Sequence, residues 1–211
     1  MDYNTDQVKE WTSDLEDFLK ALGEKSLCLS ILHKYSEQHF SYKSTMIDLP
    51  VIVLSTLCGS LTLSAKNMFG EEMENDALKI VGGLSLFTSI LATIQSYFAY
   101  NRCAENHRIS QISYSQLYRF LKVQLGLPRK QRMAPSNLLK VTMSSFERLT
   151  ETSNLIPVSI SVKFKKEYKK EKTVSRPSEV NGLESIKVHM EEKQDDLVEI
   201  KTDDYVVEEL V

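Results

Sequence analysis

Two long apolar stretches dominate the hydrophobic pattern of the chain. The first lies at residues 47–66, and Asp48 is the one charge before its last residue. The second lies at 77–100 and has no charge after Lys79. A helix needs about 20 mostly apolar residues to cross the ~30 Å hydrocarbon core of a bilayer. Both stretches meet this limit, the first barely, so the pattern predicts two transmembrane helices.

The ends of these segments favour a membrane over the alternative of two buried helices in a soluble bundle. Tyr97, Phe98 and Tyr100 close the second segment in the way that interfacial aromatic residues do. Pro50 lies near the start of the first, where a missing backbone N–H costs little. The connector between the segments is short, so we expect the two helices to form a hairpin.

The polar residues of the second segment are sorted onto one side of the helix. At 100° per residue, the small, hydroxyl and amide side chains fall in an arc roughly 160° wide, and large apolar side chains fill the opposite arc. The polar arc holds Ser85, Thr88, Ser89, Thr93, Gln95 and Ser96, together with Ala92 and Ala99. Such a stripe faces either protein, in a packed and hydrogen-bonded seam, or water, in the pore of an oligomer. Both alternatives stay open.

Small residues also line the first segment. The candidate packing residues are Ser55, Gly59 and Thr62 in one ridge, Thr56, Ser60 and Ser64 in another, and Gly82 and Gly83 in the second segment. Small side chains let membrane helices approach closely. Two ridges allow two neighbours, the hairpin partner and a second copy of the protein, and therefore indicate a homo-oligomer.

Amphipathic helical patterns flank the hairpin. Apolar residues at helical spacing predict helices at 6–20 and 24–46, and the second continues into the first membrane helix. No glycine or proline follows the second membrane segment until Gly126, so one helix is predicted from 77 to 125. A further helix is predicted at 137–150. These segments predict a small helical bundle on the cytosolic side.

The predicted fold is therefore all-α, a two-helix transmembrane hairpin whose long helices extend into a cytosolic bundle. The predicted order is N-terminal cytosolic helices at 1–46, the hairpin at 47–100, cytosolic helices at 101–160, a basic segment at 161–173 and an acidic, disordered tail at 174–211. The connector carries four acidic residues against two lysines, whereas the flanks are rich in lysine and arginine. By the positive-inside rule, both termini face the cytosol.

The basic segment and the tail have opposite charge. In the basic segment, the candidate contacts to lipid headgroups are Lys163, Lys165, Lys166, Lys169 and Lys170. These lysines either bind anionic lipid, which attracts each of them by about 1 kcal/mol, or belong to a helix that is only solvated. Nucleic acid is not an expected partner, because the segment has no interleaved aromatic residues and no recognisable binding fold. The tail holds eleven acidic and four basic residues without periodicity. Its final stretch, DLVEIKTDDYVVEELV, is a candidate docking peptide for a cytosolic partner.

No arrangement of catalytic residues is recognisable. His33 and Glu37 lie one helical turn apart, with His39 close behind and His107 at a similar depth on the other helix. These residues form either a metal or proton-sensing cluster or, more commonly, hydrogen bonds between helices. Phosphate-binding loops and CxxC motifs are missing. We therefore expect no enzyme activity, no cofactor and no metal.

Several segments, in a distinctive order, carry a resemblance to a known family. They are Trp11, HKYS (33–36), LPVIVLSTLCGSLTLS (49–64), IVGGLSLFTSILATIQ (80–95), ENHRISQISYSQLYRFLKVQL (105–125) and FERLTETSNLIP (146–157). In these segments the chain resembles the SLATT family (SMODS- and SLOG-associating effector domain), and especially its members in nucleocytoplasmic large DNA viruses.

The resemblance implies a two-helix membrane protein with cytosolic helices, located in a host or virion membrane if the chain is viral. For the bacterial relatives it implies an effector role, in which oligomers permeabilise a membrane beside a nucleotide-sensing partner. The leading hypothesis is thus a two-pass membrane protein that self-associates and acts as a pore-forming or membrane-perturbing effector. The alternative is a non-enzymatic structural or adaptor protein that recruits partners through its basic segment and tail.

Overall fold

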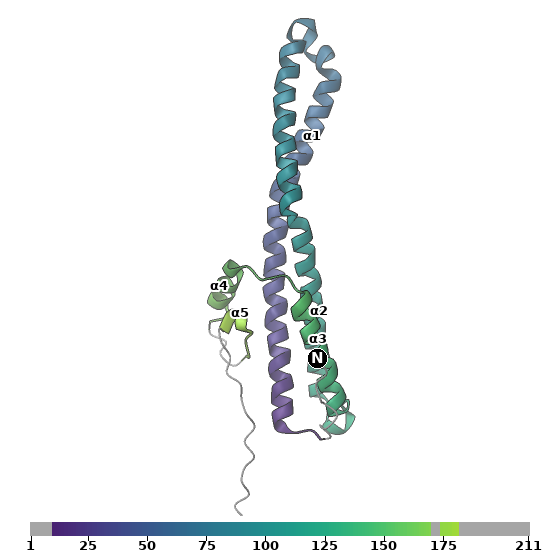
Figure 1. Cartoon of the computed structure of the whole chain (residues 1–211), viewed down its shortest axis with the longest axis vertical. Helices are drawn as coiled ribbons and strands as arrows, with labels where there is room; N and C mark the ends of the chain where they lie inside the picture. Colours follow the sequence, from purple (N-terminus) through teal and green to yellow (C-terminus); the bar gives the residue numbers. More distant parts are fainter. Residues whose placement is uncertain (1–9, 170–173, 182–211) are drawn as a thin grey trace, which may run out of the picture.

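The chain forms a long helical rod with a hairpin at one end and a small bundle at the other (Figure 1). The computed structural model describes residues 10–169 and 174–181, with the backbone alone for 65–69 and 71–72. The elements are α1 (Ser13–Phe98), α2 (Tyr100–Gly126), the short 3₁₀ helix η2 (Arg129–Gln131), α3 (Pro135–Thr152), α4 (Val158–Glu167) and α5 (Ser178–Asn181). The predicted all-α fold is confirmed.

The helix α1 runs the length of the rod and folds back on itself. It starts after Thr12, whose hydroxyl oxygen accepts a hydrogen bond from the Leu15 N–H at 3.3 Å. At Gly70 the backbone leaves helical geometry, with φ 75° and ψ 170°. Only glycine adopts this φ without strain, so residue 70 is where the helix can reverse direction. The predicted helical hairpin is confirmed, and its arms continue as helix through the predicted connector.

A single helix replaces the two predicted at 6–20 and 24–46. The start of the first lies outside the described residues, and the observed helix begins only at Ser13. Gly23 does not interrupt the helix, and it lies against Leu121 of α2. A Cβ at residue 23 would lie 3.5 Å from the Cδ1 atom of Leu121. This glycine therefore serves helix packing rather than a turn.

One prediction about helix continuity is confirmed and another is wrong. The helix predicted at 24–46 continues into the first arm, so Pro50 lies inside α1 and not in a first helical turn, where its missing N–H would cost little. The helix predicted at 77–125 is interrupted at Ala99, which adopts the left-handed conformation with φ 43° and ψ 43°. The Ala99 N–H still donates to the Gln95 carbonyl at 3.0 Å, and α2 starts at the next residue. The break is thus a kink between hairpin and bundle.

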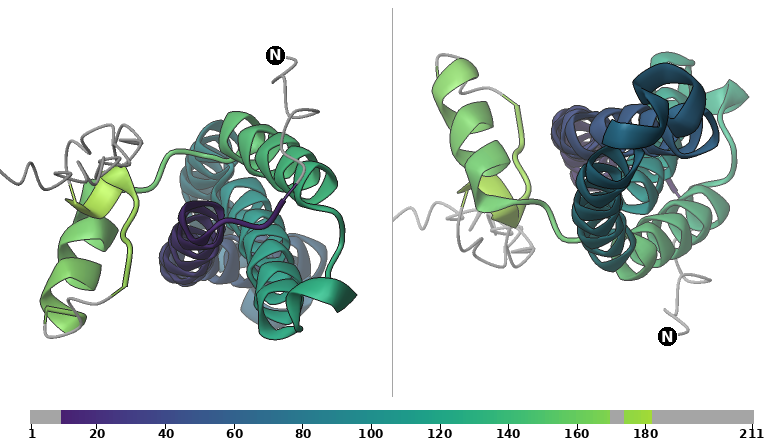
Figure 2. Two further views of the ribbon diagram at one scale, coloured as in Figure 1. Left: turned by 90° about the horizontal axis from the view of Figure 1, so that it is seen from below. Right: turned by 90° about the horizontal axis from the view of Figure 1, so that it is seen from above.

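The bundle surrounds the lower parts of α1 and α2. Viewed along the rod, α3 lies on one side of this helix pair and α4 with α5 on another (Figure 2). The helix predicted at 137–150 is confirmed as α3. One core cluster is formed by Leu19, Leu117, Leu121 and Leu138, and a second by Cys28, Leu29, Leu32, Tyr114, Ile160, Phe164 and Val180. The bundle therefore buries its apolar residues within the chain.

An ion-pair cluster fixes the loop between α2 and α3 to the start of α1. Glu16 accepts hydrogen bonds from both Arg129 and Arg132. These hydrogen bonds, that of Arg129 first, lower the pKa of Glu16 to about 2. The Arg132 guanidinium also lies 5.1 Å from the Trp11 ring. The loop is thereby held against the end of the rod.

Residues 174–181 are ordered and packed, contrary to the expectation of disorder from Val174 onward. Val180 is buried in the second core cluster, Val174 packs beside it, and Pro177 is also buried. The Ser175 N–H donates to Glu24 Oε2 at 2.8 Å. Apolar residues at a spacing of three give this segment a face that covers α1. The rest of the predicted tail, 182–211, lies outside the described residues.

Candidate membrane hairpin and its polar residues

Both arms of the hairpin carry apolar surface that the chain leaves uncovered. In Ser13–Ser64 and Met73–Gly126 the most apolar 18-residue windows have a mean hydropathy of 1.8, and only 6% and 11% of these windows are buried. A core helix of a soluble protein would be mostly buried. Exposed large side chains include Leu49, Ile52, Val53, Leu57 and Leu63 on the first arm and Ile80, Leu86, Phe87, Ile90 and Ile94 on the second. The two arms are long and apolar enough to span a membrane.

The contact between the arms is a narrow seam. Cys58, Val81 and Thr88 are its buried residues. The two arms lie beside each other at the hairpin end of the rod, apart from α3, α4 and α5 (Figure 1), so the arms cover these residues by packing on one another. Leu54 and Leu84 are half-buried beside them. Each arm therefore uses one face for its partner, and the rest of its circumference stays exposed.

The polar stripe of the second arm is divided between this seam and the exterior. Thr88 is buried in the seam, and Ser85 and Gln95 are half-buried beside it. Ser89, Thr93 and Ser96 are exposed. We call these three residues the outer hydroxyl ridge. The stripe predicted from the sequence thus contains two faces with different neighbours.

Three hydroxyl groups of the stripe are satisfied within their own helix. Thr88, Ser89 and Thr93 each donate to the carbonyl four residues earlier, at 2.9 Å. A hydroxyl that donates in this way retains acceptor capacity. Ser89 and Thr93 therefore need no water to satisfy their hydroxyl protons, and their small side chains still offer acceptors to a neighbouring helix.

The candidate packing residues of the first arm do not lie in the seam. Ser55, Gly59 and Thr62 are exposed, as are Gly82 and Gly83 on the second arm. A Cβ placed on any of these three glycines would meet no atom within 4 Å. Ser64, at the end of the other ridge, is half-buried, whereas the seam itself uses the Cys58 face. Packing of these ridges against a second copy stays a prediction.

A polar cleft lies where the hairpin joins the bundle. It has a volume of about 420 Å³ and is lined from α1 by Ser44, Ile47, Asp48, Ala92, Gln95 and Ser96, and around the kink by Ala99, Tyr100, Asn101 and Arg102. The Ser44 hydroxyl donates to Asp48 Oδ2 at 2.8 Å. Asp48 Oδ1 is buried and has no hydrogen-bond partner in the part of the chain that the structure describes. Sequence reasoning noted Asp48 as an edge charge but missed the cleft, since the kink at Ala99 carries no sequence signal.

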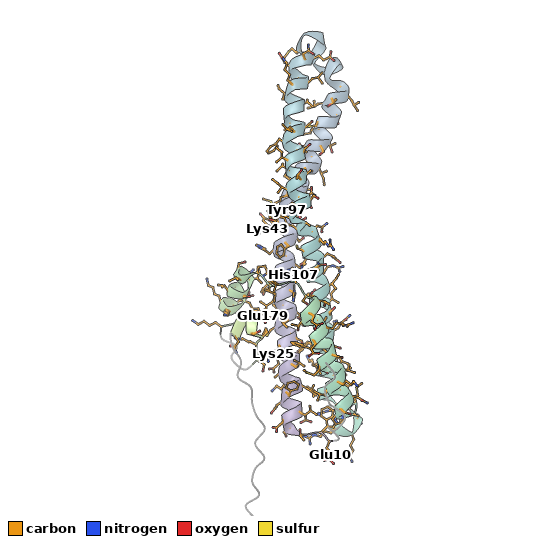
Figure 3. The ribbon with its side chains drawn as sticks, in the orientation of Figure 1. Glu10, Lys25, Lys43, Tyr97, His107 and Glu179 are labelled. Atoms are coloured by element: carbon orange, nitrogen blue, oxygen red, sulfur yellow. The ribbon has the colours of Figure 1, made fainter. Side chains whose placement is uncertain are left out.

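Aromatic and basic side chains surround this junction. Phe98 and Tyr100 stack with ring centroids 5.2 Å apart, and Tyr100 lies 6.2 Å from Phe40. The Lys43 ammonium lies 5.6 Å from the Tyr100 centroid. Lys43 and Tyr97 lie at the same level of the rod, with His107 further into the bundle (Figure 3). This composition matches the interfacial region of a bilayer, where aromatic rings and lysines gather.

Two buried histidines join α1 to α2 inside the bundle. His33 Nδ1 and His107 Nδ1 lie 2.8 Å apart, and each residue is 1% exposed. Tyr114 stacks on His33 and Phe40 stacks on His107, at centroid distances of 5.5 and 5.4 Å. Burial, and then the proximity of His107, lowers the pKa of His33 to about 4; burial also lowers the pKa of His107. The interpretation as hydrogen-bond partners between helices is confirmed for this pair.

The lysine-rich segment is partly helical and fixed to the bundle. In α4, Ile160 and Phe164 are buried, whereas the lysines at 163, 165, 166 and 169 are exposed; Lys170 lies outside the described residues. The Tyr35 hydroxyl donates to Glu167 Oε1 at 3.0 Å, and Lys163 Nζ lies 4.9 Å from the Tyr35 centroid. The apolar face and the Lys163–Tyr35 contact thus hold α4 on α1, while Lys165 and Lys166 remain exposed, as does Lys169 beyond the end of the helix.

Among residues 10–169 and 174–181 no three His, Cys, Asp or Glu side chains lie together as a metal would require. Comparison of the chain with protein-family models, with curated proteins and with solved structures gives no match. Function must therefore be argued from the hairpin, its border and the bundle alone.

Proposed function

We propose that the protein is a two-pass integral membrane protein, with the hairpin in lipid and both termini in the cytosol. The observation that carries the proposal is the apolar surface of the two arms, whose windows are only 6% and 11% buried. Leaving such a surface in water costs about 25 cal/mol per Å². The same chain buries the leucines of its bundle and leaves the apolar residues of the arms exposed. This difference is expected if the bundle lies in water and the arms lie in lipid.

The junction supports the same placement. Lys43 and the aromatic residues around Tyr100 lie at the level where headgroups would meet the hairpin. The acidic residues near Gly70 lie at the opposite end of the arms, and the basic bundle lies below the junction. The positive-inside rule then assigns the bundle to the cytosol. This arrangement is also the one that the resemblance to SLATT proteins implies.

We further propose that copies of the hairpin associate through the outer hydroxyl ridge and perturb or permeabilise the membrane. Ser89, Thr93 and Ser96 are small, exposed and adjacent to large apolar side chains. In lipid, a partner helix packs closely against such a ridge, and each interhelical hydrogen bond contributes roughly 0.6–2 kcal/mol. If several copies turn these ridges to a common axis, the hydroxyl groups line a polar path.

Dye release from liposomes tests this proposal. The wild-type protein is expected to release dye, and Ser89→Leu combined with Thr93→Leu is expected to abolish release, because leucine blocks close approach and removes the acceptors. Ser41→Leu combined with Thr45→Leu makes the matched change at an exposed serine and threonine one turn apart in α1, outside the arms and their packing ridges, and is expected to retain release. Carbonate-resistant insertion is measured for all three proteins. Release that persists in the Ser89/Thr93 variant, with insertion intact, contradicts the ridge as the functional surface.

A second candidate function, that of an anchored adaptor, is favoured by the geometry of α4. Its buried face docks on α1, while Lys165 and Lys166, and Lys169 just beyond the helix, are exposed. The hairpin would then serve as an anchor, and α4 and the acidic tail would recruit anionic lipid or a cytosolic partner. This candidate predicts no dye release, together with loss of partner binding when 182–211 is deleted. Unchanged partner binding after that deletion contradicts recruitment by the tail.

A further inference from the structure

We propose that the cleft at the kink binds the phosphoethanolamine headgroup of a membrane lipid. The inference rests on the proposed placement of the hairpin in a bilayer. The cleft has a volume of about 420 Å³, within the usual range of small-ligand sites. It lies between the arms at the level of Lys43 and Tyr100, where lipid headgroups are found.

One wall of the cleft requires a hydrogen-bond donor. Asp48 Oδ2 is bonded by the Ser44 hydroxyl, whereas Oδ1 is buried and has no partner among the described residues. A buried carboxylate oxygen without a donor is unfavourable, and an ammonium group satisfies both its charge and its lone pairs. Lys43 lies five residues before Asp48, but its ammonium group is over the Tyr100 ring and does not bond Oδ1. Arg102 lines the same cleft but gives Asp48 Oδ1 no hydrogen bond, so this oxygen still lacks a cationic N–H donor among the described residues.

A second part of the cleft lining, formed by the start of α2, favours an anion. The left-handed conformation of Ala99 ends α1 and lets α2 begin at Tyr100, beside the cleft. The first N–H groups of a helix have no partner within it and carry a partial positive charge, which suits a phosphate group. Arg102 adds a guanidinium to this wall. A helix that continued through residue 99 would pair these N–H groups with its own carbonyls.

The two walls together match a zwitterion with an ammonium at one end and a phosphate at the other. Gln95 and Asn101 supply further polar groups between them. Phosphatidylethanolamine carries N–H donors on its ammonium, whereas the quaternary nitrogen of phosphatidylcholine carries none. Asp48 therefore selects the first lipid over the second, and the acyl chains extend along the exposed apolar face of the arms.

Thermal unfolding of the full-length protein in detergent micelles, with equal mole fractions of added lipid, tests the site. Phosphatidylethanolamine is expected to raise the melting temperature by about 5 °C relative to phosphatidylcholine, since a ligand that binds only the folded state stabilises it. Asp48→Asn is expected to remove this difference, and Arg102→Gln to reduce the affinity about tenfold. Asp76→Asn and Arg119→Gln make the same changes outside the cleft and are expected to retain the difference in melting temperature between the two lipids.

Two outcomes overturn the site, and a third overturns its assignment to a lipid. Equal stabilisation of the wild type by both lipids contradicts the selection by Asp48. Retention of the lipid difference in Asp48→Asn and in Arg102→Gln contradicts the assignment of the two walls, and the second variant decides if the first fails to fold. An equal shift with soluble glycerophosphoethanolamine alone shows that the cleft takes the free group rather than a lipid. Insertion of the wild-type protein into phosphatidylcholine vesicles is measured in parallel. If the protein does not insert, the proposed function is refuted. If it inserts and one of the three outcomes is observed, only the proposal about the lipid headgroup is refuted.

Discussion

The buried histidine pair makes the stability of the bundle depend on pH. His33 and His107 are both 1% exposed and share a contact of 2.8 Å between their Nδ1 atoms. In a hydrogen bond between two imidazole nitrogens one donates and the other accepts, so at least one ring is neutral. Protonation of both rings replaces the hydrogen bond with two buried positive charges. We therefore expect the bundle to loosen in acid.

The size of the effect follows from the pKa of His33. Burial, and then the charge of His107, lowers this pKa from 6.5 to about 4 in the folded protein. Below pH 6.5 the unfolded chain consequently binds more protons than the folded one, so stability that is fully present above this pH is lost as the pH falls towards 4. At pH 5 the loss from His33 is about 2 kcal/mol. His107, whose pKa burial also lowers, adds to it.

Urea unfolding at pH 7 and pH 5, followed by tryptophan fluorescence, measures this loss. Trp11 is the one tryptophan of the chain and packs against the first core cluster, so its emission reports the bundle. His33→Gln is expected to remove most of the pH dependence, because the amide keeps a hydrogen-bonding group that does not titrate. His39→Gln, outside the pair, is expected to retain it. Equal free energies of unfolding at both pH values refute the reasoning, as does a pH dependence that survives in His33→Gln.

Three further predictions concern single positions in the rod. Ala99→Gly is expected to stabilise the protein by about 1 kcal/mol in thermal unfolding, because glycine tolerates the left-handed φ of 43°; destabilisation would indicate an ordinary continuous helix. Gly23→Ala is expected to be neutral or stabilising by up to about 1 kcal/mol, since its Cβ would meet Leu121 at an ordinary 3.5 Å. Gly23→Leu is expected to cost about 1–3 kcal/mol through overpacking, and an equal stability of both variants would contradict the close approach. Val180→Asp is expected to speed maleimide labelling of Cys28 at least about tenfold by opening the cluster that buries both residues; unchanged labelling would show that residues 174–181 do not cover it.

Periodicity and length were sufficient to predict the main architecture. The apolar runs at 47–66 and 77–100 identified the two arms, because the physical requirement for spanning lipid is a simple one of length and composition. The helical spacing at 137–150 identified α3 for a similar reason. Element boundaries depended on tertiary contacts and were less predictable. Gly23 resembles a helix break in sequence, yet it is retained inside α1 by its contact with Leu121.

The polar residues show the same division. The sorted arc of the second arm was visible from the sequence, but its division into a seam face and the outer hydroxyl ridge depends on where the first arm packs. The cleft at Asp48 depends on the kink at Ala99, and alanine gives no sign of a left-handed conformation. The pairing of His33 with His107 was foreseeable as a contact between helices at a similar depth, although its geometry was not.

Labelling of single cysteines in sealed vesicles tests the central claim, that the hairpin crosses the bilayer twice. Cys28, Cys58 and Cys103 are replaced by alanine, and one cysteine is introduced at exposed Asn75 near the hairpin tip or at exposed Lys140 in α3. A membrane-impermeant maleimide is expected to label these two positions from opposite sides of the membrane, with residue 140 on the cytosolic side. Labelling of both positions from the same side would contradict the account.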